Sequence, residues 1–265
     1  MIPVYVVVRD LLDAPKRLVE QIHNLRDGLP IVIDCESTNP KCIEWLGSLS
    51  TPVYRTKNYG VHAPWDGGFI LDKMHHAKRF GSSYYVVTDC DLDIGSVPTD
   101  VLTRMRTILN ERDDIQKVGL SIEINDLPDN DMKDQILSFE EKYWKVRDNS
   151  GWSADCDSAF CMYRAGSNWT GYQCIRLDRP YTARHVPWYW DATNLPADAQ
   201  WYVEHVDGRF STWGMKLKES RGESNAAAAC DVSVSDVPQV EAAVELDRLF
   251  PGTGLSGGIA EPDRS

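Results

Sequence analysis

Three aspartates follow an apolar stretch at every second position. Residues 84–88 read YYVVT, and Asp89, Asp91 and Asp93 come directly after them. In an extended chain, side chains two residues apart face the same side, about 6–7 Å apart. Two carboxylates about 4 Å apart repel by roughly 1 kcal/mol in water and roughly 4 kcal/mol at an effective dielectric of 20. A divalent cation between them removes this repulsion, and oxygen ligands suit Mg²⁺ or Mn²⁺. The spacing therefore indicates either a metal site or a solvated loop in which Asp93 caps the next turn.

A second apolar stretch, IVI at residues 31–33, also ends in an acid. Asp34 is followed closely by Ser37 and Thr38. An aspartate here can accept a hydrogen bond from a nucleobase N–H or a ribose hydroxyl. The other interpretation is a turn aspartate followed by helix-capping hydroxyls.

The second half of the chain carries two further groups of polar and aromatic residues. The segment GWSADCDSAF at 151–160 holds Asp155 and Asp157, and ARHVPWYWD at 183–191 holds Arg184 and His185. His185 could bind a ligand or be an ordinary packed histidine, and His205 is the competing candidate. Trp188 and Trp190 could stack on a sugar or pack in the core. His75 and His76 are adjacent in a predicted helix, where their side chains diverge, so we do not expect them to share a metal ion.

Strands and helices alternate along the first half of the chain. Apolar runs predict strands and helical spacing of apolar residues predicts helices between them. The predicted strands are 4–8, 31–33, 52–56, 84–88 and 117–124, and the predicted helices are 14–26, a helix that begins near Pro40, 67–81 and 98–110. This alternation is typical of an α/β fold with a mostly parallel, Rossmann-like sheet flanked by helices. Ligands bind such sheets outside the carboxyl ends of the strands, which places Arg9, residues 34–38 and residues 89–93 along one crevice.

The second half is less regular. We expect a helix over residues 138–146, a strand over 158–164 and a loop over 181–191. Together these features predict one domain over 1–220, with a ligand-binding half at 1–110 and a second half at 111–220. Residues 221–265 lose the pattern and read as a partly disordered tail, in which 239–250 could form one amphipathic helix.

Composition excludes some classes of function. The net charge of −12 argues against nucleic-acid binding, which needs a basic face. No run approaches the roughly 20 apolar residues of a membrane helix, and the first residues read as a strand rather than a signal peptide. The seven cysteines are odd in number and form no C-x-x-C pair, which favours reduced thiols and a cytoplasmic location.

Taken in order, these segments resemble a known family. VYVVVRDLLDAPKRLVEQI, IVIDCESTNPKCIEWL, TKNYG and YYVVTDCDLD are similar to the nucleotide-sugar half of GT-A glycosyltransferases, particularly family 2. The resemblance covers about residues 3–110. It implies the GT-A fold, a nucleoside-diphosphate sugar as donor, and Mn²⁺ or Mg²⁺ held by a D-x-D pair.

The resemblance also implies roles for single residues. Asp34 matches the acid that contacts the nucleobase, with Arg9 and Ser37 in the same crevice. Asn58 and Gly60 match the turn that borders the nucleotide. Asp89 and Asp91 match the D-x-D pair, although 91/93 remains possible. Arg184 would neutralise the leaving diphosphate, and His185 would complete the metal shell.

GWSADCDSAF resembles the G-W-x-x-E-D segment of the acceptor site in inverting members of this fold. Trp152, Trp188 and Trp190 would then contact the acceptor. Asp157, or second Asp155, would be the general base, although two acids two residues apart replace the usual adjacent pair.

The function implied is transfer of a sugar, with UDP as the expected nucleotide, to a hydroxyl of a glycan, lipid-linked or small-molecule acceptor. An aspartate base would make the enzyme inverting. One alternative is a nucleotidyltransferase that makes sugar nucleotides, but RDLLDAPKR after the first strand lacks the glycine-rich loop of that class. The other is a non-catalytic carbohydrate-binding protein, which would explain the tryptophans alone.

Overall fold

The computed structural model describes residues 1–156, 159–206, 208 and 212–220. The chain divides into two compact units, Met1–Asp231 and Val232–Ser265, and every described residue belongs to the first. The predicted tail over 221–265, with its possible helix at 239–250, lies outside the described residues. Among the helices that are described, none is long and apolar enough to cross a membrane.

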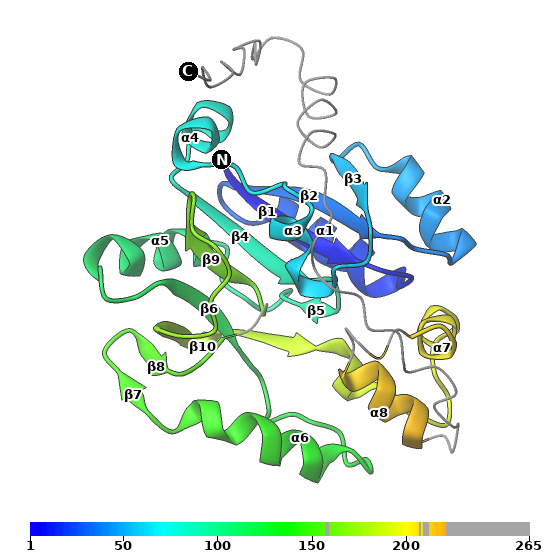
Figure 1. The fold of residues 1–265 in the computed structure, drawn as a ribbon. Helices are drawn as coiled ribbons and strands as arrows, with labels where there is room; N and C mark the ends of the chain where they lie inside the picture. Colours follow the sequence, from blue (N-terminus) through cyan, green and yellow to red (C-terminus); the bar gives the residue numbers. More distant parts are fainter. Residues whose placement is uncertain (157–158, 207, 209–211, 221–265) are drawn as a thin grey trace, which may run out of the picture. The chain divides into compact units, whose positions relative to one another are not determined.

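One mixed sheet of ten strands runs through the described part of the chain (Figure 1). Its order is β3-β2-β1-β4-β9-β6-β10-β8-β7, with β5 paired to β10. The strands are β1 (Ile2–Val8), β2 (Gly28–Cys35), β3 (Val53–Thr56), β4 (Tyr84–Asp89), β5 (Leu92–Asp93), β6 (Lys117–Ile122), β7 (Arg147–Asp148), β8 (Gly151–Ser153), β9 (Cys161–Arg164) and β10 (Cys174–His185).

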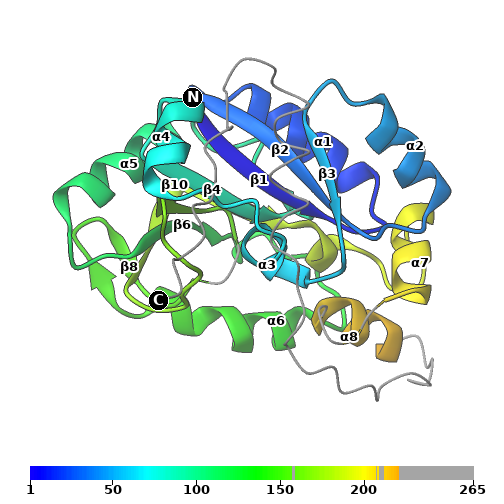
Figure 2. The ribbon, with the colours of Figure 1, turned by 45° about the horizontal axis from the view of Figure 1, so that its top comes forward.

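Helices cover both faces of this sheet (Figure 2). The helices are α1 (Asp13–His23), α2 (Pro40–Ser48), α3 (Ala63–Asp66), α4 (Lys73–Phe80), α5 (Val101–Glu111), α6 (Lys133–Glu140), α7 (Ala197–Glu204) and α8 (Thr212–Ser220), with short 3₁₀ helices η1 (Gly60–His62), η2 (Glu141–Trp144) and η3 (Val186–Tyr189). Alternate residues of β1 point to opposite faces. Val4 and Val6 pack into the core shared with α1 and α5, whereas the Tyr5 ring meets Tyr85 on the other face, and its hydroxyl donates to the Phe69 carbonyl.

The strand order creates a switch point between β1 and β4. Strands β3, β2, β1 and β4 are parallel neighbours. The chain leaves β1 to build β2 and β3 on one side and then returns to build β4 on the other. In open α/β sheets, ligands bind in the crevice outside the carboxyl ends of the strands at such a point. Here that crevice lies beyond Val8, the last residue of β1, and Asp89, the last residue of β4.

The predicted first half is confirmed with adjusted ends, except for one helix. Residues 67–81 were expected to be helical throughout, but α4 begins only at Lys73. The Asp72 side chain caps it by accepting from the backbone N–H groups of Met74 and His75. Gly68 before it has φ of +73°, outside the helical region.

Three predictions in the second half are wrong. Residues 181–191 were expected to be a loop, but β10 runs to His185 because it pairs with both β6 and β5. The helix predicted over 138–146 ends at Glu140 and continues only as η2, because Arg147 turns into the β7–β8 hairpin opposite Trp152. The strand predicted over 158–164 begins only at Cys161, opposite Gly119 and Val87.

Candidate active site

A cavity of about 380 Å³ opens at the switch point between β1 and β4. Val7 and Arg9 come to it from the end of β1, and Asp89 and Asp91 from the end of β4. The predicted site residues that line it are Arg9, Asn58, Gly60, Asp89, Asp91, His185, Trp188 and Trp190. Residues from both predicted halves of the domain therefore meet in one cavity.

The pairing of β5 with β10 brings Asp91 and His185 together. In its antiparallel register His185 lies opposite Leu92, and the N–H of Val186 donates to the Asp91 carbonyl at 2.8 Å. The side chains then meet, with His185 Nε2 3.4 Å from Asp91 Oδ2. Burial raises the pKa of the Asp91 carboxyl, but the charge of His185 and its hydrogen bond outweigh burial, so the pKa lies below its usual value.

This pair fits part of a divalent metal site. Asp91 Oδ1 is buried and has no hydrogen-bond partner among the described residues. In the same part of the chain, no group of three or more His, Cys, Asp or Glu side chains is arranged to hold a metal ion. Mg²⁺ and similar ions are commonly bound by one or two carboxylates together with substrate phosphates. The donors at Asp91 and His185 therefore suit an ion whose shell is completed by a ligand and water.

Asn58 and Gly60 form the turn that the sequence predicted. The Asn58 side-chain oxygen accepts from the Gly60 N–H at 3.1 Å, and Gly60 has φ of +56°, which glycine adopts without strain. Glu36 fixes the turn by accepting from the Asn58 N–H at 3.0 Å. Beside it, Arg9 Nη1 donates to the Cys35 carbonyl at 3.0 Å, which holds Arg9 at the cavity wall.

Asp34 and Ser37 hold the loop after β2 together and do not belong to the described lining. Asp34 is 1% exposed and accepts from the Ser37 N–H and from Arg55 Nε, at 2.9 and 2.6 Å. The Ser37 hydroxyl accepts from the Asp10 N–H at 2.9 Å. Both side chains are therefore engaged within the protein, and they support the loop that ends at the cavity.

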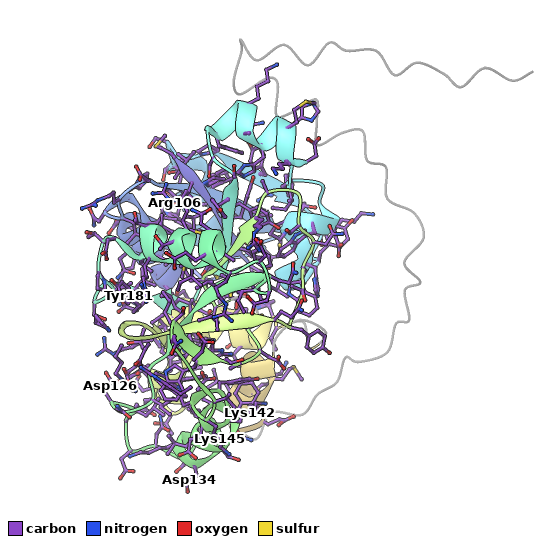
Figure 3. All side chains as sticks on the ribbon, turned by 90° about the vertical axis from the view of Figure 1, so that its left-hand side faces the viewer. Arg106, Asp126, Asp134, Lys142, Lys145 and Tyr181 are labelled. Atoms are coloured by element: carbon purple, nitrogen blue, oxygen red, sulfur yellow. The ribbon has the colours of Figure 1, made fainter. Side chains whose placement is uncertain are left out.

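Asp93 and Arg184 do not belong to the described lining of the cavity, and their predicted roles stay predictions. Asp93 Oδ1 accepts from Gln21 Nε2 on α1 at 2.8 Å and from the Gly95 N–H at 2.9 Å. Arg184 Nε donates to Asp126 at 2.6 Å. Asp126, which is labelled in Figure 3, is exposed. Successive side chains of a strand point in opposite directions. His185 therefore faces the cavity and Arg184 does not.

The predicted acceptor segment contributes little to the described lining. Trp152 Nε1 donates to Asp178 at 3.1 Å, and the Arg147 guanidinium lies 4.6 Å from the centre of its ring. The Asp155 side chain is exposed and does not belong to the described lining, and its role as a base stays a prediction. Asp157 lies outside the described residues.

Two tryptophans, Trp188 in η3 and Trp190 directly after it, line the cavity. Trp188 is 2% exposed, and its ring centre lies 5.0 Å from that of His185. The competing histidine, His205, is exposed and stacks on Trp201, with ring centres 4.4 Å apart.

Sequence reasoning missed four lining residues that carry a charged side chain or a hydroxyl group. They are Glu140, Arg176, Tyr202 and Lys216. Each lies in a segment that carries no recognisable motif, so only the pairing of distant elements brings it to the cavity.

No protein-family model matches the chain, and no curated protein matches its sequence. Among solved structures, the chain is similar to glucosyl-3-phosphoglycerate synthase from Mycobacterium tuberculosis in complex with Mn²⁺, UDP-glucose and phosphoglyceric acid. The match has 15% identity and a TM-score of 0.34, and it covers 62% of this chain and 56% of the synthase. The same synthase with phosphoglyceric acid matches at 12% identity and a TM-score of 0.38, over 85% of this chain and 81% of the other. A structure described only as a mycobacterial protein matches at 16% identity and a TM-score of 0.33, over 62% and 53%.

Proposed function

We propose that the protein is a metal-dependent glycosyltransferase that moves a sugar from a nucleoside-diphosphate sugar to a hydroxyl acceptor. The observation that carries the proposal is the joining of Asp91 and His185 in a cavity at the β1/β4 switch point. The order of motifs along residues 3–110 resembles the GT-A nucleotide-sugar half and agrees with this position.

Each predicted site residue that lines the cavity has a task in this proposal. Asp91 and His185 hold Mn²⁺ or Mg²⁺, with Asp89 beside them at the end of β4. When bound, the ion supplies positive charge for the leaving diphosphate. The Asn58–Gly60 turn and Arg9 border the nucleotide. Trp188 and Trp190 offer ring surface to a sugar. An inverting outcome depends on an aspartate base and remains a prediction.

Titration calorimetry with UDP, with and without Mn²⁺, tests the donor half of the proposal. We expect Mn²⁺ to strengthen UDP binding, and Asp91→Asn to weaken the Mn²⁺-dependent part by about 10- to 100-fold, because a charged ligand is lost. Release of free sugar from UDP-sugars in the presence of Mn²⁺ would then report turnover.

Asp93→Asn is the matched control, because it changes the same kind of side chain two residues away. Asp93 bonds to Gln21 and Gly95 rather than lining the cavity, so this variant should bind UDP and Mn²⁺ like the wild type. The proposal fails if no nucleoside diphosphate binds, or if the two variants lose binding equally.

A further inference from the structure

A buried ion pair lies in the wall of the same cavity. Glu140 is the last residue of α6 and Arg176 lies in β10, with Glu140 Oε1 2.6 Å from Arg176 Nη1. Their side chains are only 2% and 3% exposed. Both line the cavity together with Asp91. Neither residue belongs to a motif that the sequence suggested.

Arg176 is fixed by contacts with three residues from two segments. Besides Glu140, its Nε donates to the Asp155 carbonyl at 2.8 Å, and its guanidinium carbon lies 3.9 Å from the centre of the Tyr143 ring in η2. The geometry of the pair is therefore set before any ligand arrives. When a ligand binds this pair, little side-chain entropy is lost, because both side chains are already held in place. This favours specific recognition.

Stability alone does not account for this pair. Two charges buried together lose their hydration, and replacing a buried ion pair by apolar residues of similar size is often neutral or stabilising. Charged groups kept in the wall of a cavity are therefore candidates for ligand recognition.

We propose that Glu140 and Arg176 bind neighbouring hydroxyl groups of a sugar ring inside the cavity. The pair carries no net charge, so it does not select an anion. A carboxylate accepts from a hydroxyl and a guanidinium donates to one, so the pair matches two adjacent hydroxyls. Phe139 and Trp188 also line the cavity and offer apolar ring surface to the C–H faces of the sugar. This inference rests on the proposed function, and the sugar is that of the donor or that of the acceptor.

The test uses a double variant, Glu140→Gln with Arg176→Met, in the full chain. It removes both charges at once, so neither is left buried alone. The matched control is Glu123→Gln with Arg179→Met. This control also removes an ion pair, in which Arg179 Nη2 lies 2.6 Å from Glu123 Oε1. Arg179 is on β10 like Arg176, but neither Glu123 nor Arg179 belongs to the described lining of the cavity. Circular dichroism and thermal melting first establish that both double variants fold.

The affinities of the wild type and of both double variants for UDP, UDP-glucose and UDP-galactose are then compared in the presence of Mn²⁺. Saturation-transfer NMR measures the binding of methyl glucoside and methyl galactoside to the same three proteins. If the sugar belongs to the donor, the Glu140/Arg176 variant keeps UDP binding but loses about 10- to 100-fold in affinity for a UDP-sugar, as expected for lost charged hydrogen bonds. If it belongs to the acceptor, UDP-sugar binding is unchanged and the methyl glycoside signal in the presence of UDP disappears. Each result supports the inference, provided that the control variant behaves like the wild type.

The inference is overturned if the folded Glu140/Arg176 variant matches the wild type in both measurements, or if the control variant changes equally. Failure of the proposed function looks different, because the wild type then binds no UDP at all. Loss of glycoside binding in the Glu140/Arg176 variant alone would, even then, support sugar recognition by the pair.

Discussion

At the scale of single residues, Glu123 should make the stability of the protein depend on pH. Its carboxylate accepts from Arg179 Nε at 2.9 Å and Nη2 at 2.6 Å, and from the N–H groups of Ile124 and Asn125. The hydrogen bonds from Arg179 lower the pKa of Glu123 from 4.5 to about 2, against a smaller opposing effect of burial. The folded state thus binds a proton less readily than the unfolded state. The stabilisation is complete above pH 4.5 and is lost as the pH falls towards 2.

Urea denaturation at several pH values between 6 and 2.5 checks this prediction. We expect Glu123→Gln to lower the free energy of unfolding at pH 6 by about 1–2 kcal/mol, a value reduced for solvent screening around the partly exposed Arg179. The difference from the wild type should shrink as the pH falls. Glu44→Gln, at an exposed position in α2, is the control. A difference that stays constant down to pH 2.5 would contradict the assignment.

The aspartates after β4 show how far single residues could be predicted. Their alternation with Cys90 and Leu92 indicated a charged strand end, and Asp89 and Asp91 do line the cavity. The sequence left open whether Asp89 or Asp93 pairs with Asp91. The position of Asp93 depends on Gln21 of α1, which binds it, and that of Asp91 depends on β10, which places His185 beside it.

At the scale of elements, α7 caps a helix that lies far away in the sequence. Asp198 Oδ2 accepts from the N–H groups of Leu12 and Asp13 at the start of α1, both at 3.0 Å. A carboxylate at a helix N-terminus satisfies free N–H groups and favours the helix dipole. Asp198→Ala should therefore lower the free energy of unfolding by about 1–2 kcal/mol in urea denaturation.

Asp191→Ala is the comparison for this long-range cap. Asp191 is exposed, whereas Asp198 is half-buried, and Asp191 accepts from Thr193, only two residues away. Its removal should cost less, since no second element is held by it. Equal losses in the two variants would mean that the link between α7 and α1 does not contribute to stability.

Strands were predicted well where the local sequence shows that they are buried. They were predicted poorly where a segment is extended only because it pairs with a strand that is distant in the sequence. The strands β1, β2 and β4 are continuous apolar runs buried on both faces, so their sequence alone identifies them. The segment RLDRPYTARH of β10 contains four charged residues and a proline, which argue against a strand. It is nevertheless extended, because β6 pairs with it on both sides of a register shift between Leu177 and Thr182. This missed strand carries Arg176 as well as His185, so the missed element and the missed lining residue Arg176 share one cause.

At the scale of the whole molecule, the predicted halves 1–110 and 111–220 share one sheet. Strand β9, from the second half, pairs with β4 of the first half and with β6. A chain cut at residue 110 would leave the edge of β4 without this partner. It would also lack β10, which supplies His185 to Asp91. We therefore expect the two halves to unfold together rather than as independent domains.

Two spectroscopic signals can follow the halves separately during urea denaturation. Six of the nine tryptophans lie between residues 152 and 213, so fluorescence reports mainly on the second half, whereas far-UV circular dichroism reports on both. We expect coincident midpoints. UDP with Mn²⁺ at about 100 times the dissociation constant should raise both by the same amount, equivalent to about 2.7 kcal/mol, because residues from both halves line the cavity. Separate transitions, a shift in only one signal, or cooperative folding of a 1–110 fragment would show that the halves are independent.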